Sequence, residues 1–271
     1  MTTLLEIVKY LRGIAPRDYT IRGHDSRVEI GPQSDSDMIN TTISRVVITT
    51  YLSGAAVTKA TQEKANLVIT FRPLFPFIVD RITGLDLKRI RLLSKNYISS
   101  YVLGSGWVGV KDGMADALCD LLGLKRLRDF VVTGDLTDVV PAGRVCGPSD
   151  VMNHSRFSDF VADKLGMESV TFSGDLDDEV QSILIFPGSY IDISEIISAK
   201  SEDVGTIVTG ELAPDVRMMA HEEGISTLEL GPFVTEDPGM ERLRHQMSLE
   251  FPELKVEFYK SLSYTRSLTR R

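Results

Sequence analysis

The glycine-rich stretch at residues 104–109 is the first pattern in the chain that could do chemistry. It reads Gly104-Ser105-Gly106-Trp107-Val108-Gly109 and follows a strand-like run, which fits the G-x-G-x-x-G motif of dinucleotide-binding folds. In those folds the helix begins within the glycines, so that its N-terminal amides bind the pyrophosphate. Here Lys111, Asp112 and Gly113 come before the helical pattern starts. The spacing therefore favours a glycine-permitted turn over a nucleotide site.

Histidine, serine and cysteine patterns add no catalytic motif. The chain has four histidines in separate segments, without the HxH or HxxxH spacing of metal ligands, namely His24, His154, His221 and His245. It has no G-x-S-x-G sequence that would hold a nucleophilic serine on a strand-to-helix turn. Its two cysteines, Cys119 and Cys146, lie far apart in the chain without a C-x-x-C pair. This pattern excludes a disulfide framework and indicates two buried thiols.

The segment at residues 65–75 is more informative. An apolar run ends in Thr70 and continues as Phe71-Arg72-Pro73. Because proline disfavours a helical conformation in the residue before it, Arg72 is expected in an extended turn at the carboxyl end of a strand. Ligands of α/β sheets bind at that edge. Arg72 is therefore a candidate ligand-binding residue.

Strand and helix patterns alternate along the whole chain and must position these residues. Strands are predicted at residues 45–49, 66–70, 97–103, 130–133, 144–146, 170–172, 182–186, 206–209, 226–230 and 255–259. Helices are predicted from Leu4 to a cap at Gly13, at 55–64, around 87–93, at 114–122, from Ser155 to Gly166, at 193–200, at 216–223 and around 240–247. This alternation favours an α/β fold with mostly parallel sheets covered by helices on both faces.

Composition and charge limit the classes of function. The 271 residues include 30 Lys and Arg against 38 Asp and Glu, a net charge of −8, which makes a nucleic-acid partner unlikely on the whole-chain balance. No run approaches the ~20 apolar residues that a membrane helix needs. Glu6 and Lys9 interrupt the apolar N-terminal pattern, which is not typical of a signal peptide. We expect a cytoplasmic protein without a membrane partner.

Several blocks of the chain resemble the NIF-three-like family, also called the GTP cyclohydrolase I type two or dinuclear-metal family. In that family the strand before the turn ends in Thr-His-His-Pro-Leu, and residues 70–74 occupy the same place here. Residues 5–16 resemble its opening helix, and Asp25 stands where its Asp-Asn-Val-Gly element begins. Residues 113–118 are similar to its Asn-Asp-Ala-Leu-Ala helix, and residues 209–236 match its Thr-Gly-Glu to Gly-His-x-x-Thr-Glu block without a gap.

The resemblance implies a fold of two interlocked α/β domains of similar build. Residues 1–126 with about 237–271 would form the first domain, and residues 127–236 the second. The resemblance also implies a homo-oligomer, a ring-shaped hexamer.

The departures from the family fall on its metal ligands. Phe71 and Arg72 replace the two histidines, Val108 takes the place of a ligand Asp, and Pro232 replaces the C-terminal histidine. Only Glu236 of the ligand set remains. Since one carboxylate cannot hold two divalent ions, we expect no metal and no cofactor. A buried Glu236 would then need a new partner, and Arg72 is the candidate, with its guanidinium at the former metal position.

These residues support three functional hypotheses. The first is a non-catalytic scaffold that binds a partner or an anionic small molecule in the former metal cleft, with Arg72, Glu236, Asp25 and Ser105 as the candidate site residues. The second is a metal-dependent hydrolase of a nucleotide-like substrate, whose relocated ligands would come from Asp25, Glu211, Asp215 and Glu236. The third, suggested by the family name alone, is a transcription-associated interaction protein, which would need an exposed apolar surface.

Overall fold

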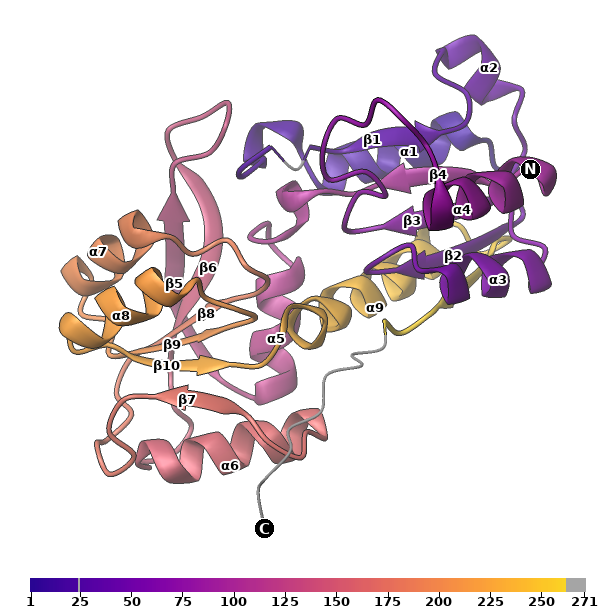
Figure 1. Cartoon of the computed structure of the whole chain (residues 1–271). Coiled ribbons are helices and arrows are strands. Elements are labelled where there is room, and N and C mark those ends of the chain that lie inside the picture. Colours follow the sequence, from indigo (N-terminus) through magenta and orange to yellow (C-terminus); the bar gives the residue numbers. More distant parts are fainter. Residues whose placement is uncertain (24, 262–271) are drawn as a thin grey trace. The chain divides into compact units, whose positions relative to one another are not determined.

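The computed structural model describes residues 1–23 and 25–261, and contacts within the chain divide it into two units, each with its own sheet (Figure 1). The first unit comprises Met1–Val110, Thr133–Val140 and Met240–Ser261. The second comprises Lys111–Val132 and Pro141–Gly239 of the described residues. His24 and the end of the expected first domain, from residue 262 on, lie outside the described residues.

The first sheet has five strands in the order β1-β4-β3-β2-β11. These strands are β1 (Arg27–Ile30), β2 (Arg45–Thr49), β3 (Leu67–Thr70), β4 (Ser99–Val102) and β11 (Lys255–Phe258). All neighbours are parallel except β1, which is antiparallel to β4 at the edge. The central strands β3 and β4 are buried along their whole length. Burial on both faces explains the apolar run Leu67–Ile69 of β3, whereas β4 also buries Ser99 and Ser100.

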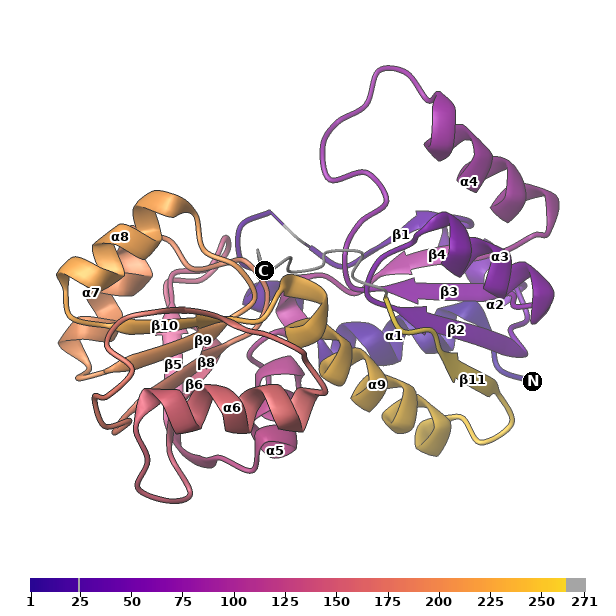
Figure 2. The same cartoon turned by 60° about the horizontal axis from the view of Figure 1, so that its bottom comes forward.

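Helices cover both faces of this sheet. They are α1 (Leu4–Ile14), α2 (Asp35–Ile39), α3 (Gly54–Gln62) and α4 (Gly84–Lys95), with 3-10 turns η1 (Arg17–Tyr19) and η2 (Ser105–Trp107). Figure 2 shows α3 and α4 on one side and α1 on the other. Helix α1 continues through Gly13 and ends at Ile14 with Ala15 as its C-cap, so the expected glycine cap is wrong. The helix ends there because Pro16 disfavours a helical conformation in the residue before it.

The second sheet has six strands in the order β5-β6-β8-β9-β10-β7. They are β5 (Lys125–Val132), β6 (Val140–Gly147), β7 (Thr171–Ser173), β8 (Ile183–Phe186), β9 (Thr206–Thr209) and β10 (Ser226–Glu229). Strands β8, β9 and β10 run parallel, whereas β6 and β7 join them antiparallel. The alternation of strand and helix thus places the parallel strands at the centre of both sheets.

Helices also cover both faces of the second sheet. They are α5 (Met114–Leu122), α6 (His154–Leu165), α7 (Ile193–Ser201), α8 (Pro214–Glu222) and α9 (Pro232–Glu250), the last of which continues into the first unit. Figure 2 shows α7 and α8 on one side and α5 and α6 on the other. Asn153, rather than the expected Ser155, caps α6, because its side chain accepts a hydrogen bond from the Arg156 amide. The expected α/β class with helix-covered sheets is confirmed.

Particular contacts assign two segments to their units. Helix α5 lies in the second unit because its apolar residues Leu118 and Leu122 join the core of that unit with Ile183 and Val208. The turn at Thr133–Val140 belongs to the first unit because Asp135 accepts hydrogen bonds from the amides of Arg22 and Gly23.

The two cysteines meet in the core of the second unit, although they are distant in sequence. The Sγ atoms of Cys119 and Cys146 are 3.4 Å apart, and both residues are fully buried free thiols. Their burial confirms the expectation of two small apolar core residues. None of the helices in the described residues offers a stretch long and apolar enough to span a bilayer.

His154, at the start of α6, is a buried titratable group. Its Nδ1 atom lies 3.0 Å from the carbonyl oxygen of Asp175, and its Nε2 atom lies 2.9 Å from Thr206 Oγ1. A carbonyl oxygen can only accept, so Nδ1 carries the proton and Nε2 accepts from Thr206. Burial lowers the pKa of His154 below 6.5, although the Asp175 carbonyl and the nearby Asp178 act in the opposite direction.

Protonation of His154 therefore makes folding less favourable when the pH falls below 6.5. Because the folded pKa lies below the unfolded value, the unfolded chain binds the proton more readily, and stability falls as pH falls below 6.5 towards the folded pKa. Urea unfolding of the wild type at a series of pH values measures this slope. His154→Gln should flatten it, whereas His221→Gln, at an exposed histidine of the same unit, should leave it unchanged. An identical slope in His154→Gln would contradict this account.

Candidate functional site

The turn that carries Arg72 is positioned by backbone hydrogen bonds at the carboxyl edge of the first sheet. The amide of Phe71 donates to the carbonyl of Thr49 at 3.3 Å, and the amide of Arg72 donates to Thr50 at 3.0 Å. These bonds extend the pairing of β2 and β3 beyond the end of β3. Phe71 is buried, whereas Arg72 is partly exposed. Arg72 therefore lies beyond the end of β3 in a non-helical bend, which agrees with the constraint from Pro73.

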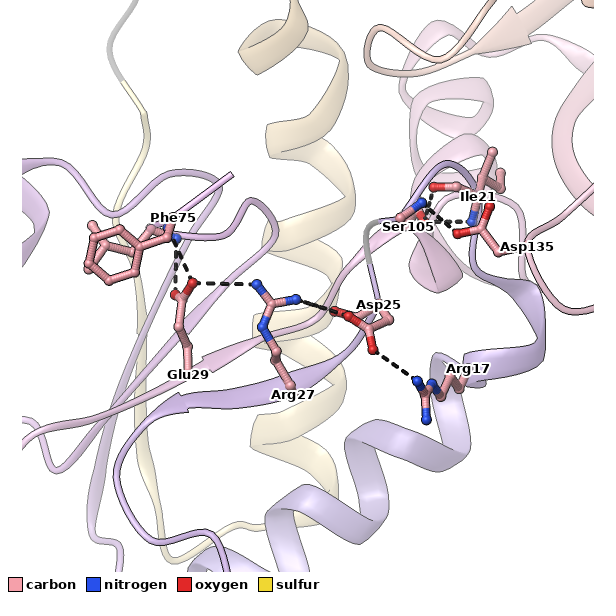
Figure 3. Close-up of polar contacts among 10 residues, drawn as sticks. Arg17, Ile21, Asp25, Arg27, Glu29, Phe75, Ser105 and Asp135 are labelled. Carbon is pink, nitrogen blue, oxygen red and sulfur yellow. Dashed lines mark hydrogen bonds and ion pairs between the residues drawn. The ribbon is translucent and has the colours of Figure 1, made fainter. Parts of the chain in front are cut away.

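Glu29 on β1 fixes the next residues of the same turn (Figure 3). Its carboxylate accepts hydrogen bonds from the amides of Leu74 at 2.9 Å and Phe75 at 3.3 Å. The side chain of Glu29 is only 6% exposed, so this carboxylate has little water to bind instead. Arg27 Nη2 lies 3.6 Å from Glu29 Oε1 and supplies the opposite charge. The edge strand β1 thereby holds the backbone that follows Arg72.

Asp25 continues this chain of charges towards α1. Its Oδ1 atom lies 2.9 Å from Arg27 Nη1, and its Oδ2 atom lies 3.4 Å from Arg17 Nη2. Figure 3 shows the resulting order from Arg17 through Asp25 and Arg27 to Glu29. A carboxylate that already faces two guanidinium groups is a weak candidate for a relocated metal ligand, because a cation would have to compete with both.

Ser105 has a structural role in the glycine-rich stretch. Its Oγ accepts a hydrogen bond from the Ile21 amide and donates one to the Ile21 carbonyl, both at 2.8 Å (Figure 3). Ser105 is buried and its single proton is used, so the hydroxyl can offer a ligand only an acceptor. A Cβ atom at Gly106 would come within 2.7 Å of the Pro16 carbonyl oxygen, so glycine is required there. The interpretation of this stretch as a glycine-permitted turn is confirmed.

Glu236, in α9, is a fully buried carboxylate of the second unit. A Cβ atom at Gly188 would lie 2.9 Å from Glu236 Oε1 and 2.7 Å from the Tyr190 ring, and Gly188 also has a positive φ of 86°. The Gly188 amide donates to Thr235 Oγ1 at 3.0 Å. Glycine at position 188 therefore lets this loop approach Glu236. Arg72 belongs to the first unit, and its pairing with Glu236 stays a prediction.

A second buried carboxylate of this unit, Glu229, was missed by motif analysis. It accepts hydrogen bonds from Arg217 Nε at 2.6 Å and Nη2 at 2.9 Å, and from the Leu212 amide at 2.9 Å. The pair joins the end of β10 to the start of α8 and fixes the loop after β9. The available signal was a glutamate inside the apolar run at residues 225–230, since a charge there requires a partner.

The side chains at positions 71, 72, 108 and 232 offer few atoms that could bind a metal ion. Phe71, Val108 and Pro232 carry no side-chain donor atom, and the guanidinium of Arg72 is a cation. Within residues 1–23 and 25–261, no three His, Cys, Asp or Glu side chains form a group that could hold an ion. Glu211 and Asp215, two of the alternative carboxylates, are exposed.

Replacing Glu29 should loosen the turn that carries Arg72. In Glu29→Gln the carboxamide can accept from only one of the two amides well and loses its charge attraction to Arg27. We expect a loss of about 1–3 kcal/mol in unfolding free energy and faster hydrogen exchange at Leu74 and Phe75. Asp80→Asn, at a 93% exposed carboxylate in the same loop, is the matched control. Unchanged exchange at both amides would rule out this role for Glu29.

Comparison with known proteins identifies the family. The model of the Duf34/NIF3 (NGG1p interacting factor 3) family matches residues 2–265. A "GTP cyclohydrolase 1 type 2 homolog" from Clostridium acetobutylicum is 26% identical over 206 residues, which cover 72% of this chain and 76% of that protein. A protein of the same name from Methanocaldococcus jannaschii is 23% identical over 259 residues, covering 93% and 98%.

Solved structures show the same fold. The Bacillus cereus protein related to NIF3 superposes with a TM-score of 0.84 at 15% identity, covering 99% of each chain. Reduced HcgD from Methanocaldococcus jannaschii gives a TM-score of 0.75 at 21% identity, covering 95% of this chain and 97% of that one. With a family model that matches nearly the whole sequence, this chain belongs to the Duf34/NIF3 family.

Proposed function

We propose that this chain is a non-catalytic NIF3 scaffold that has lost the dinuclear metal centre and binds an anionic small molecule at the former ligand positions. The observation that carries the proposal is the donor set. Four ligand positions of the family hold Phe71, Arg72, Val108 and Pro232, and none of these side chains can coordinate a divalent cation. The remaining ligand, Glu236, is a single carboxylate.

The charge at the sheet edge supports an anion rather than a cation as the ligand. Arg72 lies on a turn that β2 and Glu29 hold in place, so its backbone position is fixed before any ligand binds. A guanidinium group recognises carboxylates and phosphates through two parallel hydrogen bonds. Exchanging histidine for arginine at this position would therefore reverse the charge preference of the site.

The names of the relatives point to a hydrolase of nucleotides. The residues of this chain do not support metal-dependent hydrolysis. Metal-dependent hydrolysis needs an ion that polarises the substrate and activates a water molecule. The described carboxylates do not gather into a group that could hold such an ion. We therefore keep the scaffold as the proposed function and derive no catalytic mechanism.

The metal content of the purified protein tests this proposal. Protein prepared without chelator should contain far less than one zinc, iron or manganese ion per chain by elemental mass spectrometry. A quadruple variant with Phe71→His, Arg72→His, Val108→Asp and Pro232→His restores the family donors and should gain metal. Stoichiometric transition metal in the wild type would overturn the proposal.

We also propose, from the family resemblance, that the chain forms a homo-oligomeric ring of six subunits. Light scattering coupled to size-exclusion chromatography should then give a mass six times that of the 30.1 kDa chain. A monomer at micromolar concentration would contradict the ring.

A further inference from the structure

The first unit contains a pocket lined by charged and hydroxyl-bearing residues, among them Asp25. Its volume is about 480 Å³, and its lining residues are Arg12, Arg17, Asp25, Ser26 and Arg27. This volume falls within the roughly 300–1,000 Å³ range of small-molecule sites. Neither Arg72 nor Glu236 lines it. The pocket collects residues from the end of α1, the start of η1 and the segment that leads into β1.

The charges of the pocket do not balance. Three guanidinium groups line it against one carboxylate, that of Asp25. Asp25 pairs with both Arg17 and Arg27, so it holds these two side chains in place while neutralising one charge. In the described part of the chain no carboxylate pairs with Arg12. Because Glu29 also faces Arg27 at 3.6 Å, the three guanidinium groups and these two carboxylates leave an excess of about one positive charge at neutral pH.

A buried hydroxyl group provides a second, independent observation. Tyr101 on β4 pairs in register with Val28 of β1, and its side chain is fully buried. Its hydroxyl lies beside Ser26 and Arg12, both of which line the pocket, and burial raises its pKa, so it stays protonated at neutral pH. Among the described residues none completes a hydrogen bond with this hydroxyl. A buried polar group without a partner is costly, and a ligand oxygen would satisfy it.

We infer that this pocket binds the phosphate group of a small phosphate monoester. The monoester carries close to two negative charges at pH 7, and its phosphate group can face the guanidinium groups of Arg12, Arg17 and Arg27 together. Its three terminal oxygens can accept hydrogen bonds from the forks of the arginines and from the hydroxyls of Ser26 and Tyr101. The volume beyond the phosphate leaves room for the organic part of the molecule. This site is separate from the one at Arg72 and does not depend on it.

Calorimetric titration with ribose 5-phosphate, inorganic phosphate and ribose tests the inference. Ribose 5-phosphate should bind and ribose should not, and affinity should fall as pH drops below about 6, where the monoester loses its second charge. Binding of ribose equal to that of ribose 5-phosphate would overturn the inference. Binding of inorganic phosphate alone would overturn the assignment to a monoester.

Three variants locate the binding site. Arg12→Gln and Tyr101→Phe should each weaken ribose 5-phosphate binding by about tenfold, because each removes a hydrogen bond to a charged oxygen. Arg91→Gln, at an exposed arginine of α4 in the same unit, should have no effect. Thermal melts of all three variants identify any loss of folding. Equal affinity of folded Arg12→Gln and wild type would place the ligand elsewhere and refute the pocket. Neither outcome depends on the metal content of the chain.

Discussion

The need to satisfy a buried carboxylate on an edge strand organises the first unit. Glu29 is almost fully removed from water, and an unpaired charge there would cost several kcal/mol. It is stabilised by two backbone amides of the turn after Pro73 and by Arg27. Arg27 in turn binds Asp25, which binds Arg17. One alternating series of charges thus joins the start of η1, the edge strand β1 and the turn that carries Arg72.

The second unit uses the same principle with a different partner. Glu229 lies at the end of a buried strand and is held by Arg217 and by the Leu212 amide, which fixes the loop after β9. Close backbone approach, rather than charge, shapes the loop near Glu236, since Gly188 leaves no space for a side chain. The Glu229–Arg217 pair and the close approach at Gly188 are both made by atoms of the chain itself. A fold of this kind does not by itself specify a reaction.

Predictions from local sequence patterns succeeded for strands that are buried along their whole length. They failed where contacts between distant residues determine the structure of a segment. The central strands have apolar runs that permit no other conformation in a covered sheet, and β2 and β9 match their predicted ranges. The edge strand β1 was missed, because its alternation of polar and apolar residues spans only four positions. The core that α5 joins was not predictable from its pattern, since an amphipathic pattern indicates that a helix buries one face but not against which sheet.

The sequence by itself determined the family and the α/β class, because each depends on the identity and order of residues along the chain. It also placed Arg72 in an extended turn, since the constraint from Pro73 is local. Only the tertiary structure decided that Ser105 binds Ile21, that Glu29 holds the turn, and that Arg12 and Ser26 line one pocket. These contacts join residues from separate elements, and their distances follow from how the chain packs in three dimensions.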